Sequence, residues 1–171
     1  MICGGVRATR LVTLASLEND TGGAVLRATS LHDARQEGIG MTITLNHTIV
    51  HSTDRHASAT LLADLLGLEP PTTYGPFAVV QVGDTSLDFA DDHAPNGFQS
   101  QHYAFLVSED DFDAIWERIR SRGLRFWADP FHRSADRINH NDGGRGLYWE
   151  DLDGHNLEIL TVPYGGWSPQ P

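Results

Sequence analysis

Residues 138–160 read INHNDGGRGLYWEDLDGHNLEIL and carry three reactive side chains, His140, Tyr148 and Glu158, at intervals of eight and ten residues. Leu157 and Ile159 flank the glutamate. Because successive side chains of a strand point to opposite faces, Glu158 is expected on the face away from these two apolar residues. The stretch is either a polar loop with two strands or one side of a metal site.

Two parts of the chain have a similar order of segments, which indicates an internal repeat. NHTIV, a helical segment and LLGLE occur first, and QHYAFLV, a second helical segment and RSRGLRF occur later. His47 precedes Gly67 by 20 residues, and His102 precedes Gly123 by 21. Glycine is the preferred left-handed residue at the end of a helix, so each unit is expected to begin with a strand and a helix.

The second of these helices has the clearer signals. Ser108 is expected to cap it, with Asp111 three residues later. Its apolar stripe has helical spacing and consists of Phe112, Ile115, Trp116 and Ile119. The first helix repeats the plan with Leu61, Leu62, Leu65 and Leu66.

The back halves of the two units also match. GDTSLDF ends the first unit and GHNLEIL ends the second, so that Asp88 superposes on Glu158. Each unit is therefore predicted to be a strand, a helix and two or three further strands, and the pair to form a two-unit α+β domain.

The periodic part of the chain has limits on both sides. Residues 1–40 have no convincing period and are interpreted as a weakly ordered extension, whereas 41–163 alternate strands and helices. The two units span about 42–92 and 99–163, and residues 164–171, YGGWSPQP, are predicted to be a C-terminal tail.

Composition excludes several classes of partner. The chain has 171 residues with 23 acidic and 12 basic side chains, a formal net charge of −11. This charge argues against nucleic acid and against an anionic membrane surface. Cys3 is the single cysteine, which rules out an internal disulfide and favours a reducing cytoplasm. No apolar run approaches the roughly 20 residues of a membrane helix.

Four polar side chains share one predicted face, opposite the apolar residues expected to pack on the helices. They are His47, Asp88, His102 and Glu158. One histidine at a strand start is more often solvated than a ligand. Two at equivalent repeat positions, each with a later carboxylate, favour a site, and two imidazoles with one carboxylate match the facial triad of non-haem Fe(II).

At this point the sequence resembles the vicinal oxygen chelate superfamily, from Thr42 to about Val162. The resemblance implies two βαβββ modules in a cupped mixed sheet with the helices on its outer face. It also implies that His47, His102 and Glu158 bind a divalent metal.

Within that superfamily, the opening stretch is similar to the motif of extradiol ring-cleaving dioxygenases. The matching residues are His140, Leu147, Tyr148, Asp151, Gly154 and Glu158, with Leu152 in place of the usual proline. More narrowly, QHYAFLVSEDDFDAIWERI and INHNDGGRGLYW resemble the ChaP-like group, whose namesake is a ring-cleaving dioxygenase of chartreusin biosynthesis.

The resemblance implies a cytoplasmic, homodimeric Fe(II) dioxygenase that oxidises or cleaves a polyketide-like phenolic ring with O2. His140 is then a candidate acid or base, and Tyr148 is expected to hydrogen-bond the reacting oxygen. Asp88 is a fourth ligand, a proton acceptor or a group that orients a histidine. The insertion at 129–144 is expected to cover the cup.

Two alternatives remain open on the sequence. A glyoxalase-type lyase or isomerase would use Ni²⁺, Zn²⁺ or Mn²⁺ without O2, and Asp88 is its best support. A metal-free binding protein of the bleomycin-resistance type would hold an aromatic ligand in the same cup. The intact His47, His102 and Glu158 argue against that second alternative.

Overall fold

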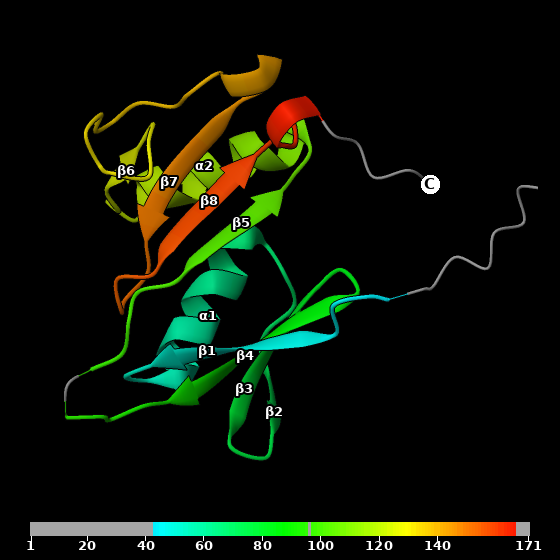
Figure 1. The fold of residues 1–171 in the computed structure, drawn as a ribbon, viewed down its shortest axis with the longest axis vertical. Helices are drawn as coiled ribbons and strands as arrows, with labels where there is room; N and C mark the ends of the chain where they lie inside the picture. The colour runs from blue at the N-terminus through cyan, green and yellow to red at the C-terminus, as the bar shows by residue number, and fades with distance from the viewer. Residues whose placement is uncertain (1–42, 96, 167–171) are drawn as a thin grey trace, which may run out of the picture. The chain divides into compact units, whose positions relative to one another are not determined.

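The computed structural model describes residues 43–95 and 97–166 (Figure 1). The predicted extension at 1–40 lies outside the described residues. In the described part, two helices and two four-stranded mixed sheets form two βαβββ modules. The predicted α+β class and its modular plan are confirmed. None of the helices in these two ranges is long and apolar enough to cross a membrane.

The first module has strand order β1-β4-β3-β2, with β1 parallel to β4. Its elements are β1 (His47–Ser52), α1 (Arg55–Leu66), β2 (Thr72–Tyr74), β3 (Phe77–Val82) and β4 (Thr85–Asp91). The second module has order β5-β8-β7-β6, with β5 parallel to β8. Its elements are β5 (His102–Leu106), α2 (Glu109–Ser121), β6 (Phe126–Trp127), β7 (Gly146–Glu150) and β8 (Asn156–Leu160).

The register of the strands confirms the repeat. In the first sheet, Ile49 lies opposite Asp88. In the second sheet, Ala104 lies opposite Glu158. Since Ile49 and Ala104 each follow the first histidine of their strand by two residues, Asp88 and Glu158 occupy equivalent places beside His47 and His102. β1 and β5 are edge strands of separate sheets, so the described chain holds two sheets and not one continuous sheet.

Both helices end and begin as local chemistry predicts. The Ser108 side chain accepts a hydrogen bond from the Asp111 backbone N–H (3.1 Å), which caps α2. Gly67 and Gly123 follow α1 and α2 with φ of 72° and 66°. This left-handed conformation costs glycine little, because it has no Cβ. Asp54 caps α1, a signal that the sequence analysis did not use.

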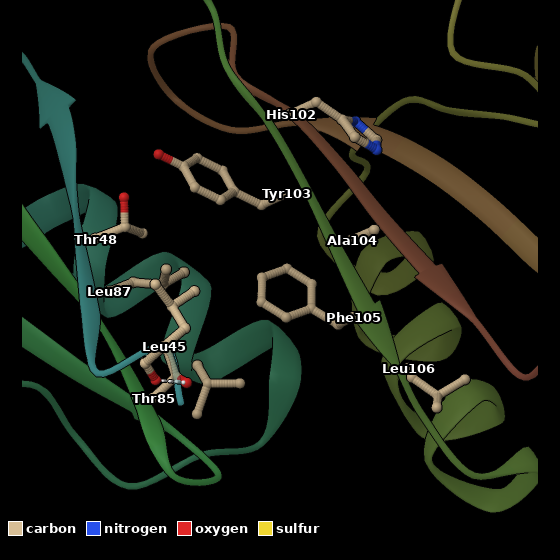
Figure 2. A pocket seen from close by; sticks show the side chains of 10 residues that line it. Leu45, Thr48, Thr85, Leu87, His102, Tyr103, Ala104, Phe105 and Leu106 are labelled. Atoms are coloured by element: carbon tan, nitrogen blue, oxygen red, sulfur yellow. Dashed lines mark hydrogen bonds between the residues drawn. The ribbon is translucent and has the colours of Figure 1, made fainter. Parts of the chain in front are cut away.

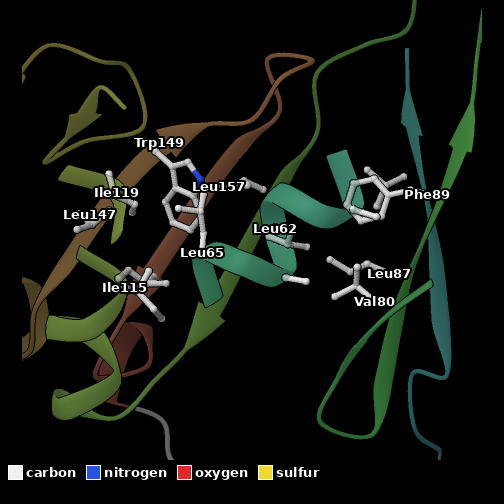
Figure 3. Packing of buried hydrophobic residues seen from close by; sticks show 14 of the residues in the cluster. Leu62, Leu65, Val80, Leu87, Phe89, Ile115, Ile119, Leu147, Trp149 and Leu157 are labelled. Carbon is white, nitrogen blue, oxygen red and sulfur yellow. The ribbon is translucent and has the colours of Figure 1, made fainter. Parts of the chain in front are cut away.

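The core is formed by the two helices and the apolar faces of the sheets (Figure 3). Phe112, Ile115 and Ile119 of α2 are buried, as the spacing predicted, and Trp116 is partly buried against them. Leu87 and Phe89, and Leu157 and Ile159, are also buried. Burial of each such side chain stabilises the fold by about 1.5–3 kcal/mol. Asp88 and Glu158, which lie between these residues in sequence, therefore take the opposite face of their sheets.

The turn between β7 and β8 links the second module to the first. Asp153 Oδ1 accepts hydrogen bonds from the Thr53 backbone N–H (3.0 Å) and hydroxyl (2.7 Å), and Oδ2 accepts one from Ser58 (2.8 Å). The buried ring of His155 donates from Nε2 to the His51 carbonyl (2.7 Å) and accepts from the Gln101 N–H at Nδ1 (2.9 Å). The DGH stretch is thus a structural link between modules.

Candidate metal centre

The outward face of the second sheet brings together three of the predicted site residues. Tyr148 of β7 lies directly opposite Glu158 of β8, and Ala104 of β5 lies on the other side of Glu158. His102 belongs to the same face, because it precedes Ala104 by two residues on its strand. His102, Tyr148 and Glu158 therefore share one surface of the sheet.

His102 and Glu158 are close enough to act together. His102 Nε2 lies 3.1 Å from Glu158 Oε2. The glutamate side chain is 1% exposed, whereas that of the histidine is 45% exposed. Two ligand atoms that each lie roughly 2.1 Å from one ion, at a right angle, are about 3 Å apart. An imidazole nitrogen and a buried carboxylate oxygen at this separation thus fit two positions of a divalent metal centre.

The second oxygen of Glu158 is held by a pair of tyrosines. Tyr164 Oη donates to Glu158 Oε1 (2.5 Å), and the hydroxyls of Tyr148 and Tyr164 are 2.6 Å apart. Burial, and then the hydrogen bond to Tyr164, raise the pKa of Tyr148 far above its usual value. Burial and the neighbouring Glu158 also raise the pKa of Tyr164. Both phenols therefore keep their protons at neutral pH.

Tyr164 is a further candidate for this site, and the sequence analysis missed it. It was assigned to the C-terminal tail, but it begins the 3-10 turn η3 (Tyr164–Gly166) and contacts Glu158. The available signal was an aromatic residue six positions after the predicted ligand, directly beyond the last strand.

His47 and Asp88 lie together on the outward face of the first sheet. They border a hollow of about 440 Å³. Its other lining residues are Asn46, Thr72, Tyr74, Phe77, Val79 and Ser86. His47 Nδ1 contacts the Asn46 amide oxygen (2.8 Å), and Asp88 Oδ1 accepts from the Ser86 hydroxyl (2.7 Å). His47 and Asp88 therefore share one face and one hollow, and each is hydrogen-bonded to a neighbouring residue.

The two halves of the predicted site are not joined within one chain. Over residues 43–95 and 97–166, no three histidine, cysteine or acidic side chains are grouped closely enough to bind one metal. His140 is exposed at the start of the 3-10 turn η2 (Asn141–Gly143), and its side chain does not cap that turn. A single chain thus presents His102 with Glu158, and His47 with Asp88, as two separate pairs.

A second, mostly apolar hollow of about 390 Å³ lies beside the edge strand β5 (Figure 2). Leu45, Leu87, Phe105 and Leu106 supply apolar surface, and His102 lines the same hollow. Leu45 and Leu106 are among the most exposed large apolar residues described, together with Ile43 and Ile49. Exposed apolar surface along an unpaired strand edge is typical of an association site.

The loop between β6 and β7 places the ring of His132 against Trp127, beside the face of the second sheet that carries Glu158. The Asp129 carboxylate accepts hydrogen bonds from the backbone N–H groups of residues 131, 133 and 134, which fixes the turn. His132 then stacks on Trp127 with ring centroids 3.8 Å apart. Because Trp127 lies opposite Tyr148, this stack borders the row that contains Glu158.

Comparison with known proteins shows the family to which the chain is related. The family described as the Glyoxalase/Bleomycin resistance protein/Dioxygenase superfamily matches residues 44–159. Oxidase ChaP-H1 is 62% identical, with a TM-score of 0.70 over 72% of this chain and 99% of that one. Oxidase ChaP-H2 is 60% identical, with a TM-score of 0.71 over 74% of this chain and all of that one.

Another relative is named for a different activity from that of the two oxidases. Glutathione transferase FosA of Serratia marcescens is 30% identical over 124 residues, which are 70% of this chain and 81% of that protein. The repeat, the two βαβββ modules and the family match agree, and the chain belongs to the Glyoxalase/Bleomycin resistance protein/Dioxygenase superfamily.

Proposed function

We propose that this protein is a metal-dependent dioxygenase that uses O2 to oxidise or cleave a phenolic aromatic ring, with Fe(II) as its metal. The observation that carries the proposal is the row of His102, Glu158 and Tyr148 on one sheet face, in a chain 62% identical to a protein named an oxidase. His102, Glu158 and His47 would hold the metal. When bound, it would supply Lewis acidity and adjacent positions for O2 and a deprotonated phenol.

The site is proposed to be completed by a second copy of the chain. His102 and Glu158 supply two ligands, and His47 lies with Asp88 in a different hollow. β1, which carries His47, and β5, which carries His102, are both edge strands with one unpaired side and with exposed apolar residues on or beside them. Pairing them between two copies would cover this surface and place His47 beside the His102–Glu158 pair. A homodimer of this kind would hold two equivalent sites.

The remaining site residues then have separate roles. Asp88 is on the same face as His47, so the same pairing of strands would bring it to the site. It is the proposed acceptor of the substrate proton. Tyr148 would hydrogen-bond the reacting oxygen atom. His140, exposed on the loop before β7, is the proposed acid that returns a proton after substrate enters. The stack of His132 on Trp127 would border the bound ring.

The test is metal content and O2 uptake of protein purified without a histidine tag. Near-stoichiometric iron, with O2 consumption on addition of polycyclic phenols, is the expected result. His102→Ala and Glu158→Ala should each lose metal and turnover, because each removes one ligand. Turnover by either variant at the wild-type rate would overturn the proposal.

The shared site can be tested by mixing two inactive variants. In a dimer of one His47→Ala chain and one Glu158→Ala chain, one site carries both defects and the other carries neither. Co-expression should restore roughly a quarter of the wild-type activity, since about half of randomly paired dimers are mixed and each has one intact site. A site formed within one chain predicts no recovery.

The relative named glutathione transferase favours one other activity, metal-dependent addition or isomerisation without O2. In that case Asp88 would act as a fourth ligand or base, and Ni²⁺, Zn²⁺ or Mn²⁺ would be the metal. Turnover that continues under strict anaerobiosis would establish this alternative and exclude the dioxygenase.

A further inference from the structure

We propose that Tyr164 is a positioning residue of this site. Its hydroxyl donates a hydrogen bond to the Glu158 carboxylate and accepts one from the Tyr148 hydroxyl. The oxygen lone pairs of Tyr148 are then available to a substrate in the proposed site. The inference rests on the proposed role of Glu158 as a metal ligand.

The direction of the hydrogen bonds follows from the number of available hydrogens. A carboxylate that binds metal is ionised, so it only accepts hydrogen bonds. Tyr164 has one hydroxyl hydrogen, and Glu158 Oε1 accepts it. The contact of 2.6 Å between the two phenols must then use the hydrogen of Tyr148. Tyr148 therefore donates to Tyr164, and its own oxygen can accept from a protonated substrate.

The two oxygens of Glu158 are divided between two tasks. Oε2 faces His102 Nε2 at 3.1 Å, and Oε1 accepts from Tyr164. A carboxylate held at one oxygen cannot rotate its other oxygen away from the ligand position without breaking that hydrogen bond. Such partners of metal ligands orient them, and their loss typically weakens metal binding by about 10- to 100-fold.

The segment that carries Tyr164 is anchored on the loop before β7. Arg145 donates its backbone N–H to the Thr161 hydroxyl (2.9 Å), and Thr161 donates its own N–H to the Arg145 carbonyl (2.9 Å). Gly144 packs so tightly on Val162 that an added Cβ would lie 2.8 Å from a valine methyl group. Tyr164 is 54% exposed, but the chain that leads to it is therefore anchored two and three residues earlier, at Val162 and Thr161.

The test is Tyr164→Phe, which removes the hydroxyl and keeps the ring. Metal-free protein is titrated with Co²⁺, and the dissociation constant and visible spectrum of the Co²⁺ form are measured without substrate. The expected result is a dissociation constant raised about 10- to 100-fold and a changed spectrum. Unfolding of the metal-free variant should be unchanged within a few degrees, which separates positioning from folding.

Tyr103→Phe is the matched control. This variant also removes a hydroxyl that donates a hydrogen bond to a side chain, that of Gln101 (2.7 Å). Tyr103, however, is in register with Leu157, on the face of the sheet opposite to Glu158. This variant should bind Co²⁺ within twofold of the wild type.

A second variant, Tyr164→Leu, tests whether the ring or the hydroxyl matters. Equal weakening by the Phe and Leu variants supports positioning by the hydroxyl. Weakening by Leu alone would show that ring packing holds Glu158, and it would overturn the proposal. Wild-type affinity in the Phe variant would overturn it as well, with the metal site intact. A wild-type protein that binds no Co²⁺ would overturn both this proposal and the metal centre.

Discussion

At the scale of residues, the chemistry of the proposed site depends on how each polar group is partnered. Glu158 is a buried carboxylate, and both of its oxygens have partners, His102 and Tyr164. An unpartnered buried charge would cost several kcal/mol, so these contacts are needed for folding as well as for metal binding. Tyr148 is 3% exposed, and its hydroxyl lies 2.6 Å from that of Tyr164.

The variant Tyr148→Phe should bind metal normally and lose activity. The variant keeps His102, Glu158 and Tyr164, so its iron content should equal that of the wild type. Turnover should fall by about 100-fold, since a positioned proton-transfer or hydrogen-bonding group contributes at least that much. Steady-state O2 uptake with iron analysis of the same sample checks both quantities. Unchanged kinetics would make Tyr148 a packing residue.

At the scale of elements, the periodic parts of the chain were predictable and the contacts between them were not. The histidine at the start of each unit, the capped α2 helix and the equivalence of Asp88 with Glu158 follow from spacing, and the structure has all three. Tyr164 follows the last strand, where no period applies, so only the folded chain brings its hydroxyl to Glu158. Strand alternation likewise predicts the face of the first sheet on which His47 lies. It does not predict whether His47 comes close to His102 and Glu158.

The turn between β7 and β8 yields a prediction of stability. Asp153→Ala removes three hydrogen bonds to Thr53 and Ser58 and should lower the free energy of unfolding by about 2 kcal/mol. Denaturant unfolding at neutral pH measures this loss. Lys or Gln substitutions at exposed Leu152 in the same turn should change it by less than about 0.5 kcal/mol.

The same carboxylate gives the link a pH dependence. Burial raises the pKa of Asp153, but the hydrogen bonds from Thr53 and Ser58 outweigh it and hold the pKa below the usual 3.8. A lowered pKa in the folded state stabilises the protein above pH 3.8, and this contribution disappears as pH falls through the folded value. The difference in stability between wild type and Asp153→Ala should therefore narrow below pH 4. A constant difference down to pH 2 would contradict the assignment.

At the scale of the whole molecule, metal binding and association are expected to be one linked equilibrium. If His47 of one copy and the His102–Glu158 pair of another bind the same ion, metal stabilises the dimer, and dilution to monomers weakens metal binding by the same factor. Sedimentation velocity with and without chelator should show a dimer that dissociates at higher concentration once metal is removed. His47→Ala should abolish this metal effect and leave the chelated dimer unchanged, because the exposed apolar edges are intact. An association constant that is independent of metal in the wild type would mean that each chain binds its ion alone.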